Sequence, residues 1–149
     1  MIKGKNFDFI PMKPTQKGVG TNIYYSVHLE GIEVGYILLE NYDFKLARAE
    51  VAYLVYKPLR NKGIATHMLK EFIEEVPNYF NVSYFDAKVR SENIASCMVL
   101  EKAGFKEKSS PNLVEDRRYF FYDTEEERLT EESKMFAEKI DKIISAKEW

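Results

Sequence analysis

The chain has 149 residues with 45% hydrophobic content and a net charge of -2, values typical of a globular protein that forms one domain, here residues 1–149. The weak negative charge gives no electrostatic basis for binding nucleic acid. Cys97 is the only cysteine, which excludes an internal disulfide and a cysteine-rich metal site, so we expect no metal. No signal peptide and no apolar stretch long enough to span a membrane is present, so we expect a cytoplasmic protein without a membrane partner.

The first part of the chain is strand-like. Aromatic and β-branched residues bounded by glycine and proline predict strands at Asn6–Ile10, Asn22–Glu30 and Glu33–Glu40. Gly31 separates the second and third of these runs, which is typical of a hairpin. The segment Lys13–Gly20, with two glycines and a proline, predicts a loop.

The middle of the chain alternates strands and helices. The run Glu50–Tyr56 predicts a strand, and apolar residues at helical spacing predict a helix over about residues 63–76 that Pro77 ends. Ser91 is a candidate N-cap for a helix that continues to Lys102. Further strands are predicted at Ser83–Val89, Phe105–Lys108 and Arg117–Tyr122. This order predicts an α+β fold with a mixed sheet and few crossover helices.

The segment Glu125–Lys147 predicts a final amphipathic helix. Its large apolar residues recur on one side, at Leu129, Phe136, Ile140, Ile143 and Ile144. The simplest interpretation is a lid over exposed sheet or core. A contact in a homodimer is the alternative.

Residues 60–66, Arg-Asn-Lys-Gly-Ile-Ala-Thr, form the turn between the strand Glu50–Tyr56 and its helix. Such a turn directs backbone N–H groups and the positive end of a helix at the mouth of the strand, which favours a phosphate. Gly63 lets the backbone approach a bulky anion closely, and Arg60 and Lys62 add positive charge. The segment lacks the two spaced glycines of a Walker loop and the three glycines of a dinucleotide fingerprint.

Two motifs in this order resemble the GNAT superfamily of N-acetyltransferases. Arg60-x-x-Gly63-x-Ala65 resembles the pyrophosphate loop of that family, and Asn93-x-x-Ser96 followed by Glu101-Lys102-Ala103-Gly104-Phe105 resembles its later helix. The closest motif match is to the ribosomal-protein N-terminal acetyltransferase branch. The resemblance implies a mixed, mostly antiparallel twisted sheet flanked by helices, to which this chain adds the C-terminal helix. Lys13–Thr21 is too short for the family's first two helices, which we expect to be absent.

The resemblance also implies acetyl-CoA as co-substrate. In the family the central strand separates from the next one, and the pantetheine arm pairs with the exposed backbone as an extra strand would. This implies a backbone contact at Leu54 and Val55, a hydrogen bond from Asn93 to pantetheine, and a contact of Lys102 with the nucleotide phosphate. The residues implied around the pyrophosphate are Arg60, Lys62, Gly63, Ile64, Ala65 and Thr66.

The chemistry is attack of an amine on a thioester, which needs a base, an oxyanion donor and a hydrogen bond to the leaving thiolate. By the family pattern Glu50 is the candidate base, with an exposed strand-end glutamate as the alternative interpretation, and the Val55 N–H is the oxyanion donor. Many relatives carry a tyrosine seven residues after the asparagine, where this chain has Leu100. Ser96 is therefore the candidate substitute acid, or else a small residue that packs against the cofactor.

These residues predict an acetyl-CoA-dependent N-acetyltransferase that acts by direct attack in a ternary complex. The acceptor is a primary amine: a protein N-terminus, a lysine or a small amine. The missing helices predict an open acceptor site, which suits a protein N-terminus or a lysine side chain better than a small antibiotic. The alternative is a catalytically weak or inactive module that binds or senses acyl-CoA, because Leu100 replaces the usual tyrosine.

Overall fold

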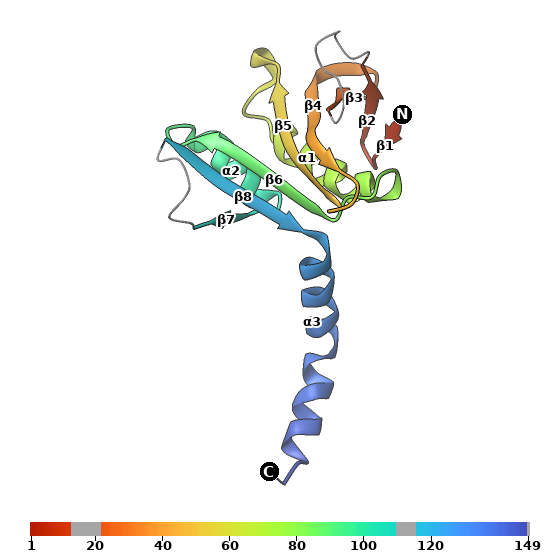
Figure 1. Ribbon diagram of the computed structural model, residues 1–149, viewed down its shortest axis with the longest axis vertical. Coiled ribbons are helices and arrows are strands. Elements are labelled where there is room, and N and C mark those ends of the chain that lie inside the picture. The colour runs from red at the N-terminus through yellow and green to blue at the C-terminus, as the bar shows by residue number, and fades with distance from the viewer. Residues whose placement is uncertain (13–21, 110–115, 149) are drawn as a thin grey trace.

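The computed structural model describes residues 1–12, 22–109 and 116–148, and within them eight strands form one twisted sheet (Figure 1). Every neighbouring pair is antiparallel except β5 and β6, which are parallel. The predicted mixed, mostly antiparallel α+β fold is therefore confirmed. In sheet order the strands are β1 (Ile2–Lys3), β2 (Phe7–Pro11), β3 (Ile23–Leu29), β4 (Ile32–Asp43), β5 (Arg48–Val55), β6 (Tyr84–Arg90), β8 (Arg117–Asp123) and β7 (Lys106–Lys108).

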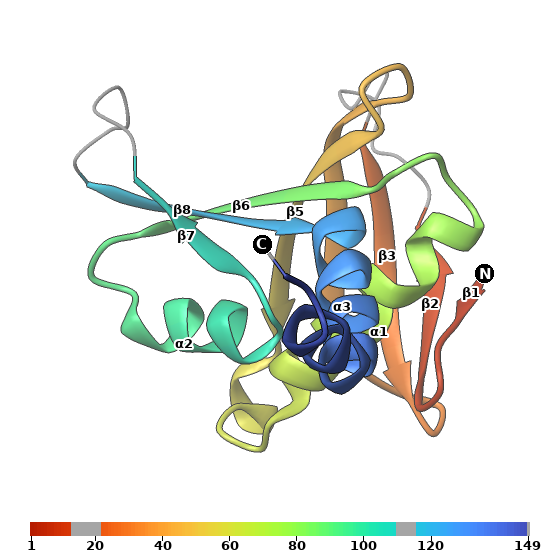
Figure 2. The same ribbon diagram turned by 90° about the horizontal axis from the view of Figure 1, so that it is seen from below.

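Helices α1 (Ile64–Glu75) and α2 (Ile94–Lys102) pack on the same face of the sheet (Figure 2). Short 3-10 turns flank α1 at Lys57–Leu59 and Val76–Asn78. The core lies between this helical layer and the sheet, and its largest fully buried side chains include Phe9, Phe72, Phe85 and Phe120. Among the described residues no helix covers the opposite face, where the side chains of β5 and β6 are partly exposed.

Helix α3 (Thr124–Ser145) extends away from the sheet as a projecting arm (Figure 1). None of its residues is buried, so the interpretation of this helix as a lid is wrong. Asp123 at the end of β8 caps the helix, because its Oδ1 accepts hydrogen bonds from the N–H groups of Glu125 (3.0 Å) and Glu126 (3.3 Å). In the part of the chain that is described, no helix has both the length and the apolar character of a membrane span.

Three details differ from the sequence predictions or lie outside the described residues. Asn93 caps α2 in place of Ser91, because its Oδ1 accepts the Ser96 N–H at 3.1 Å while the Ser91 N–H bonds to the Asp116 carbonyl. Strand β1 was not predicted, since two residues are too few to show a pattern. The predicted loop Lys13–Gly20 lies outside the described residues.

A buried carboxylate joins the helical layer to the N-terminal edge of the sheet. Glu71 of α1 is only 8% exposed, and its Oε1 accepts the backbone N–H groups of Asn6 (2.7 Å) and Phe7 (3.1 Å). Its Oε2 accepts the Asn6 side-chain amide at 2.9 Å. One side chain thus satisfies three donors in the turn between β1 and β2.

We predict that Glu71→Ala destabilises the protein by about 2–4 kcal/mol, because it leaves buried N–H donors without an acceptor. Urea denaturation monitored by circular dichroism measures the loss. Glu74→Ala, at an exposed position on the same helix, is the matched control and should change stability by less than about 0.5 kcal/mol. Equal losses for both variants would contradict the role assigned to Glu71.

Candidate active site

The candidate site lies where the parallel strands β5 and β6 separate. The two strands pair only at Arg48–Tyr84, Ala49–Phe85 and Glu50–Asp86. Beyond Glu50, strand β5 stays with β4 as far as the Val55–Gly35 pair. Strand β6 stays with β8 as far as the Arg90–Arg117 pair. The strands therefore diverge, and within the described residues the inner edge of β5 from Val51 to Val55 has no strand partner (Figure 1).

Alternate residues of β5 direct their backbone N–H and C=O groups toward the side where β6 departs. The Tyr56 N–H donates to the Val34 carbonyl of β4 at 3.0 Å. Because backbone groups alternate along an antiparallel strand, those of Leu54 also point to β4, whereas those of Tyr53 and Val55 point to the side where β6 departs. Of the two predicted backbone contacts, this geometry favours Val55 over Leu54.

The turn at 60–63 and the first turn of α1 lie just beyond the end of β5. Asn61 and Gly63 have positive φ values of 64° and 82°, and Lys62 is exposed. Within the described part of the chain no side chain caps the N-terminus of α1, so the first N–H groups of the helix remain available there. The Arg60 Nε donates to the Val55 carbonyl at 2.9 Å, which fixes the turn against the strand. The turn thus has the form of an anion site.

Glu50 occupies the last paired position before the strands diverge. It lies between Glu40 of β4 and Asp86 of β6, and its side chain is 31% exposed on the face without helices. Its Oε2 is 4.0 Å from the Nζ of Lys88. Asp86 is more strongly engaged, because Arg48 and Lys108 each approach it to 2.6 Å. Glu50 is therefore the less neutralised carboxylate at this point.

Tyr53 is a candidate that the sequence patterns did not indicate. Its hydroxyl lies 2.9 Å from the Oγ of Ser96, so it connects β5 to α2 across the divergence. Burial raises the pKa of Tyr53 to about 12, and the phenol stays protonated near neutral pH. Tyr53 lies on the helical face because side chains alternate along β5. Its contact with Ser96 could not be predicted from local sequence patterns, because the two residues are 43 positions apart. Leu100 and Cys97 are buried in the core.

Asn93 and Lys102 lie at opposite ends of α2. The Asn93 Oδ1 is used by the cap, which leaves its amide N–H groups for another partner. Lys102 lines a hollow of about 200 Å³ together with Lys70 and Glu74, toward the C-terminal half of α1. The contact of Lys102 with the nucleotide phosphate stays a prediction.

A sequence model of the family described as acetyltransferase (GNAT) domain matches residues 7–106. The chain belongs to the GNAT acetyltransferase family. No curated protein matches it by sequence. The GNAT motifs identified in the sequence lie within the matched region, at the turn after β5 and on α2.

Solved structures share the GNAT fold of this chain. RimL, described as a ribosomal L7/L12 alpha-N-protein acetyltransferase in complex with coenzyme A, is 15% identical with a TM-score of 0.62, and the match covers 70% of this chain and 63% of RimL. RimJ of Mycobacterium smegmatis in complex with CoA-disulfide is 25% identical with a TM-score of 0.64, covering 72% and 55%. Spermidine N-acetyltransferase from Vibrio cholerae in complex with CoA and spermine is 17% identical with a TM-score of 0.65, covering 72% and 69%. This chain therefore spans less than two thirds of RimL and RimJ.

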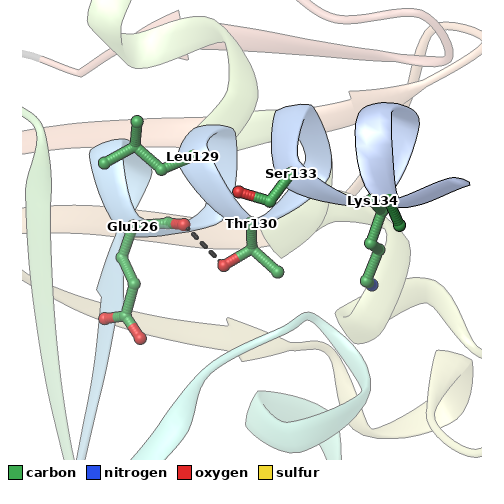
Figure 3. Close-up of a pocket in the computed structure, with 6 residues that line it drawn as sticks. Glu126, Leu129, Thr130, Ser133 and Lys134 are labelled. Carbon is green, nitrogen blue, oxygen red and sulfur yellow. Dashed lines mark hydrogen bonds between the residues drawn. The ribbon is translucent and has the colours of Figure 1, made fainter. Parts of the chain in front are cut away.

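A separate hollow lies along α3 of this GNAT protein (Figure 3). All its lining residues belong to α3, and the Thr130 hydroxyl donates to the Glu126 carbonyl one turn earlier at 2.8 Å. A hollow bounded by one helix does not enclose a ligand. Within the described ranges, no group of three or more His, Cys, Asp or Glu residues is arranged to hold a metal ion.

Proposed function

We propose that this protein is an N-acetyltransferase that transfers the acetyl group of acetyl-CoA to a primary amine. The divergence of β5 from β6 beside the uncapped N-terminus of α1 carries the proposal. The divergence offers unpaired backbone groups to the amides of pantetheine, and the helix end offers N–H groups to its pyrophosphate. The RimL, RimJ and spermidine N-acetyltransferase structures, which share the fold, contain CoA or a CoA disulfide.

The cofactor would lie along the helical face of the sheet. Val55 would accept a pantetheine N–H at its carbonyl oxygen, which has a second lone pair besides the one used by the Arg60 Nε, and the Asn93 amide would donate to the same arm. The pyrophosphate would rest on the first N–H groups of α1, at Gly63, Ile64, Ala65 and Thr66, beside the positive charges of Arg60 and Lys62.

The amine would attack from the opposite face. Side chains alternate along β5, so Glu50 and Tyr53 lie on opposite faces of the sheet. An amine that enters from the face without helices meets Glu50, which would accept its proton directly or through water. The thioester carbonyl would then develop negative charge next to the Val55 N–H, which points into the divergence. Transfer is direct, within a ternary complex and without a covalent enzyme intermediate.

The leaving thiolate would depart toward Tyr53 and Ser96. A phenol with a pKa near 12 does not transfer its proton completely to a thiolate, whose conjugate acid has a pKa near 8.5. The pair would therefore stabilise the thiolate by hydrogen bonding, while the proton that completes the thiol comes from water or from the nitrogen of the attacking amine, which loses it as the amide forms. In this proposal Tyr53 supplies the phenol that Leu100 cannot supply.

The open face of the sheet supports an acceptor larger than a small molecule. Among the described residues no helix walls the approach to Glu50, so a protein N-terminus or an accessible lysine side chain would reach it. RimL is described as an acetyltransferase of a ribosomal protein, and the Vibrio cholerae structure as one of spermidine. We favour a polypeptide amine as the acceptor.

We predict that acetyl-CoA binds the protein and that Gly63→Ala weakens binding about 5–10-fold. A Cβ at Gly63 has room but disfavours the positive φ that orients the helix N-terminus, at a cost of roughly 1–2 kcal/mol. Isothermal titration calorimetry measures both affinities. Gly31→Ala is the matched control, because Gly31 has a similar φ of 80° in the β3–β4 turn and open space around it. No heat with millimolar acetyl-CoA would refute the cofactor assignment.

Replacement of the usual phenol by buried Leu100 also favours a second candidate, a module that binds acyl-CoA without catalysis. Turnover separates the two functions. Release of free CoA thiol with a panel of peptides, lysine esters and polyamines supports the enzyme. Tight acetyl-CoA binding with no thiol release on any acceptor supports the module.

We predict that Glu50→Gln lowers kcat about 100-fold, because the amide cannot accept a proton from the amine. Stopped-time thiol-release assays across pH 6–9 measure the effect. The affinity for acetyl-CoA should stay within about 2-fold, since Glu50 lies on the face opposite the cofactor. Glu40→Gln, at the neighbouring position on β4, is the control and should retain most of the activity. Unchanged kinetics in Glu50→Gln would remove this residue from the mechanism.

We predict that Tyr53→Phe lowers kcat about 10-fold or more while the KM for acetyl-CoA changes little, because the lost hydrogen bond acts on the leaving thiolate. Ser96→Ala should have a similar effect, and the double variant should lose less than the product of the two. Steady-state kinetics measure this coupling. Tyr25→Phe is the matched control, since burial also raises the pKa of Tyr25 to about 12 but its ring packs on Phe72 in the core. Full activity of Tyr53→Phe would overturn the assignment.

A further inference from the structure

The projecting helix α3 carries an apolar stripe that no described part of the chain covers. Leu129, Phe136, Ile140 and Ile143 are between 44% and 53% exposed, and they recur at intervals of three, four and seven residues. This spacing is that of a helix that packs along its length against another helix. The stripe is unusual for a surface exposed to water, where large continuous apolar patches mark interaction sites.

Local interactions stabilise α3 only in part. Arg128 forms ion pairs with Glu125 (2.9 Å) and Glu132 (2.7 Å), and Asp123 caps the first turn. Such exposed pairs stabilise a helix only weakly. Lys106 of β7 pairs with Glu126 (2.8 Å) and Glu127 (3.7 Å) in the first turn, but no residue of α3 is buried. Most helices depend for their stability on burial of an apolar face. Burial of the stripe against a partner would supply that stabilisation.

The charge distribution along α3 identifies the partner as another α3. Between residues 124 and 133 the helix carries five glutamates and one arginine, and between 134 and its end at Ser145 it carries three lysines and two acidic residues. In an antiparallel pair each acidic half lies beside the lysine-rich half of the other helix. A parallel pair would place glutamates beside glutamates, and the repulsion between these like charges would destabilise the dimer.

The side-chain sizes also fit an antiparallel pair. With a twofold axis between Phe136 and Ala137, the large Phe136 ring faces the small Ala137 of the other helix. The same axis places Ile140 opposite Ser133, and Leu129 opposite Ile144. Large residues thus meet small ones at the centre, where close packing of helices requires it.

We propose that α3 is the dimerisation element of this protein, pairing antiparallel with α3 of a second copy. The interface is isologous, as in most homodimers. Because α3 projects from the end of β8, the two sheets lie at opposite ends of the helix pair and both β5–β6 divergences stay accessible (Figure 1). This inference does not depend on the proposed enzymatic activity.

The first test is sedimentation equilibrium of the full chain. The wild type should be a dimer, and Phe136→Glu combined with Ile140→Glu should raise its dissociation constant at least about 100-fold, because two central apolar residues become charged. Met135→Glu is the matched control, since Met135 is 78% exposed and lies off the stripe. A wild type that stays monomeric at 100 µM, or a dimer that the double variant does not weaken, would overturn the proposal.

The second test fixes the direction of the helices. Leu129→Cys and Ile144→Cys are made as separate variants, and Cys97, buried in the core, is left in place. On mild oxidation, a mixture of the two variants should form a disulfide-linked heterodimer, while Leu129→Cys alone should not crosslink. Crosslinking of Leu129→Cys with itself in preference to the mixture would show a parallel pair and refute the antiparallel arrangement. Far-UV circular dichroism and thermal unfolding of each variant confirm that its sheet domain is folded.

Discussion

The separation of β5 from β6 is the constraint on which the candidate site depends. Strand β5 stays paired with β4 and strand β6 with β8, while β5 and β6 pair with each other over only three residues. Strands β5 and β6 are held together where their pairing begins. The Ala47 carbonyl accepts the N–H groups of Ser83 and Tyr84, and Asp86 forms an ion pair with Arg48. The divergence is thus a fixed part of the sheet and leaves backbone groups ready for an extended ligand.

Strand alternation gives this divergence two chemically different sides. On the helical face, Tyr53 and Ser96 offer hydroxyl groups in a largely dehydrated setting, and burial keeps the phenol protonated. On the other face, Glu50 is partly exposed and is less engaged by cations than Asp86. A base on one side and hydrogen-bond donors on the other suit a transfer in which the attacking group enters opposite the leaving group.

Much of the anion site was predictable because its geometry is local. A strand, a turn with Gly63 and an amphipathic helix necessarily direct N–H groups at the strand end, and the structure contains all three. The strand and helix order likewise predicted the mixed sheet. The predicted N-cap of α2, Ser91, was wrong by two residues. Both Ser91 and Asn93 have suitable side chains, and only the turn geometry selects Asn93.

The sequence by itself determined most of the strands and helices, the position of the candidate anion-binding turn and the apolar face of α3, because these properties depend on residues close together in the chain. Only the tertiary structure placed Tyr53 beside Ser96 and Glu71 beside Asn6, pairs that lie 43 and 65 positions apart. It also decided that α3 projects from the sheet and does not cover it. Such contacts depend on the angles at which strands diverge and helices leave the sheet, and local residue patterns do not encode those angles.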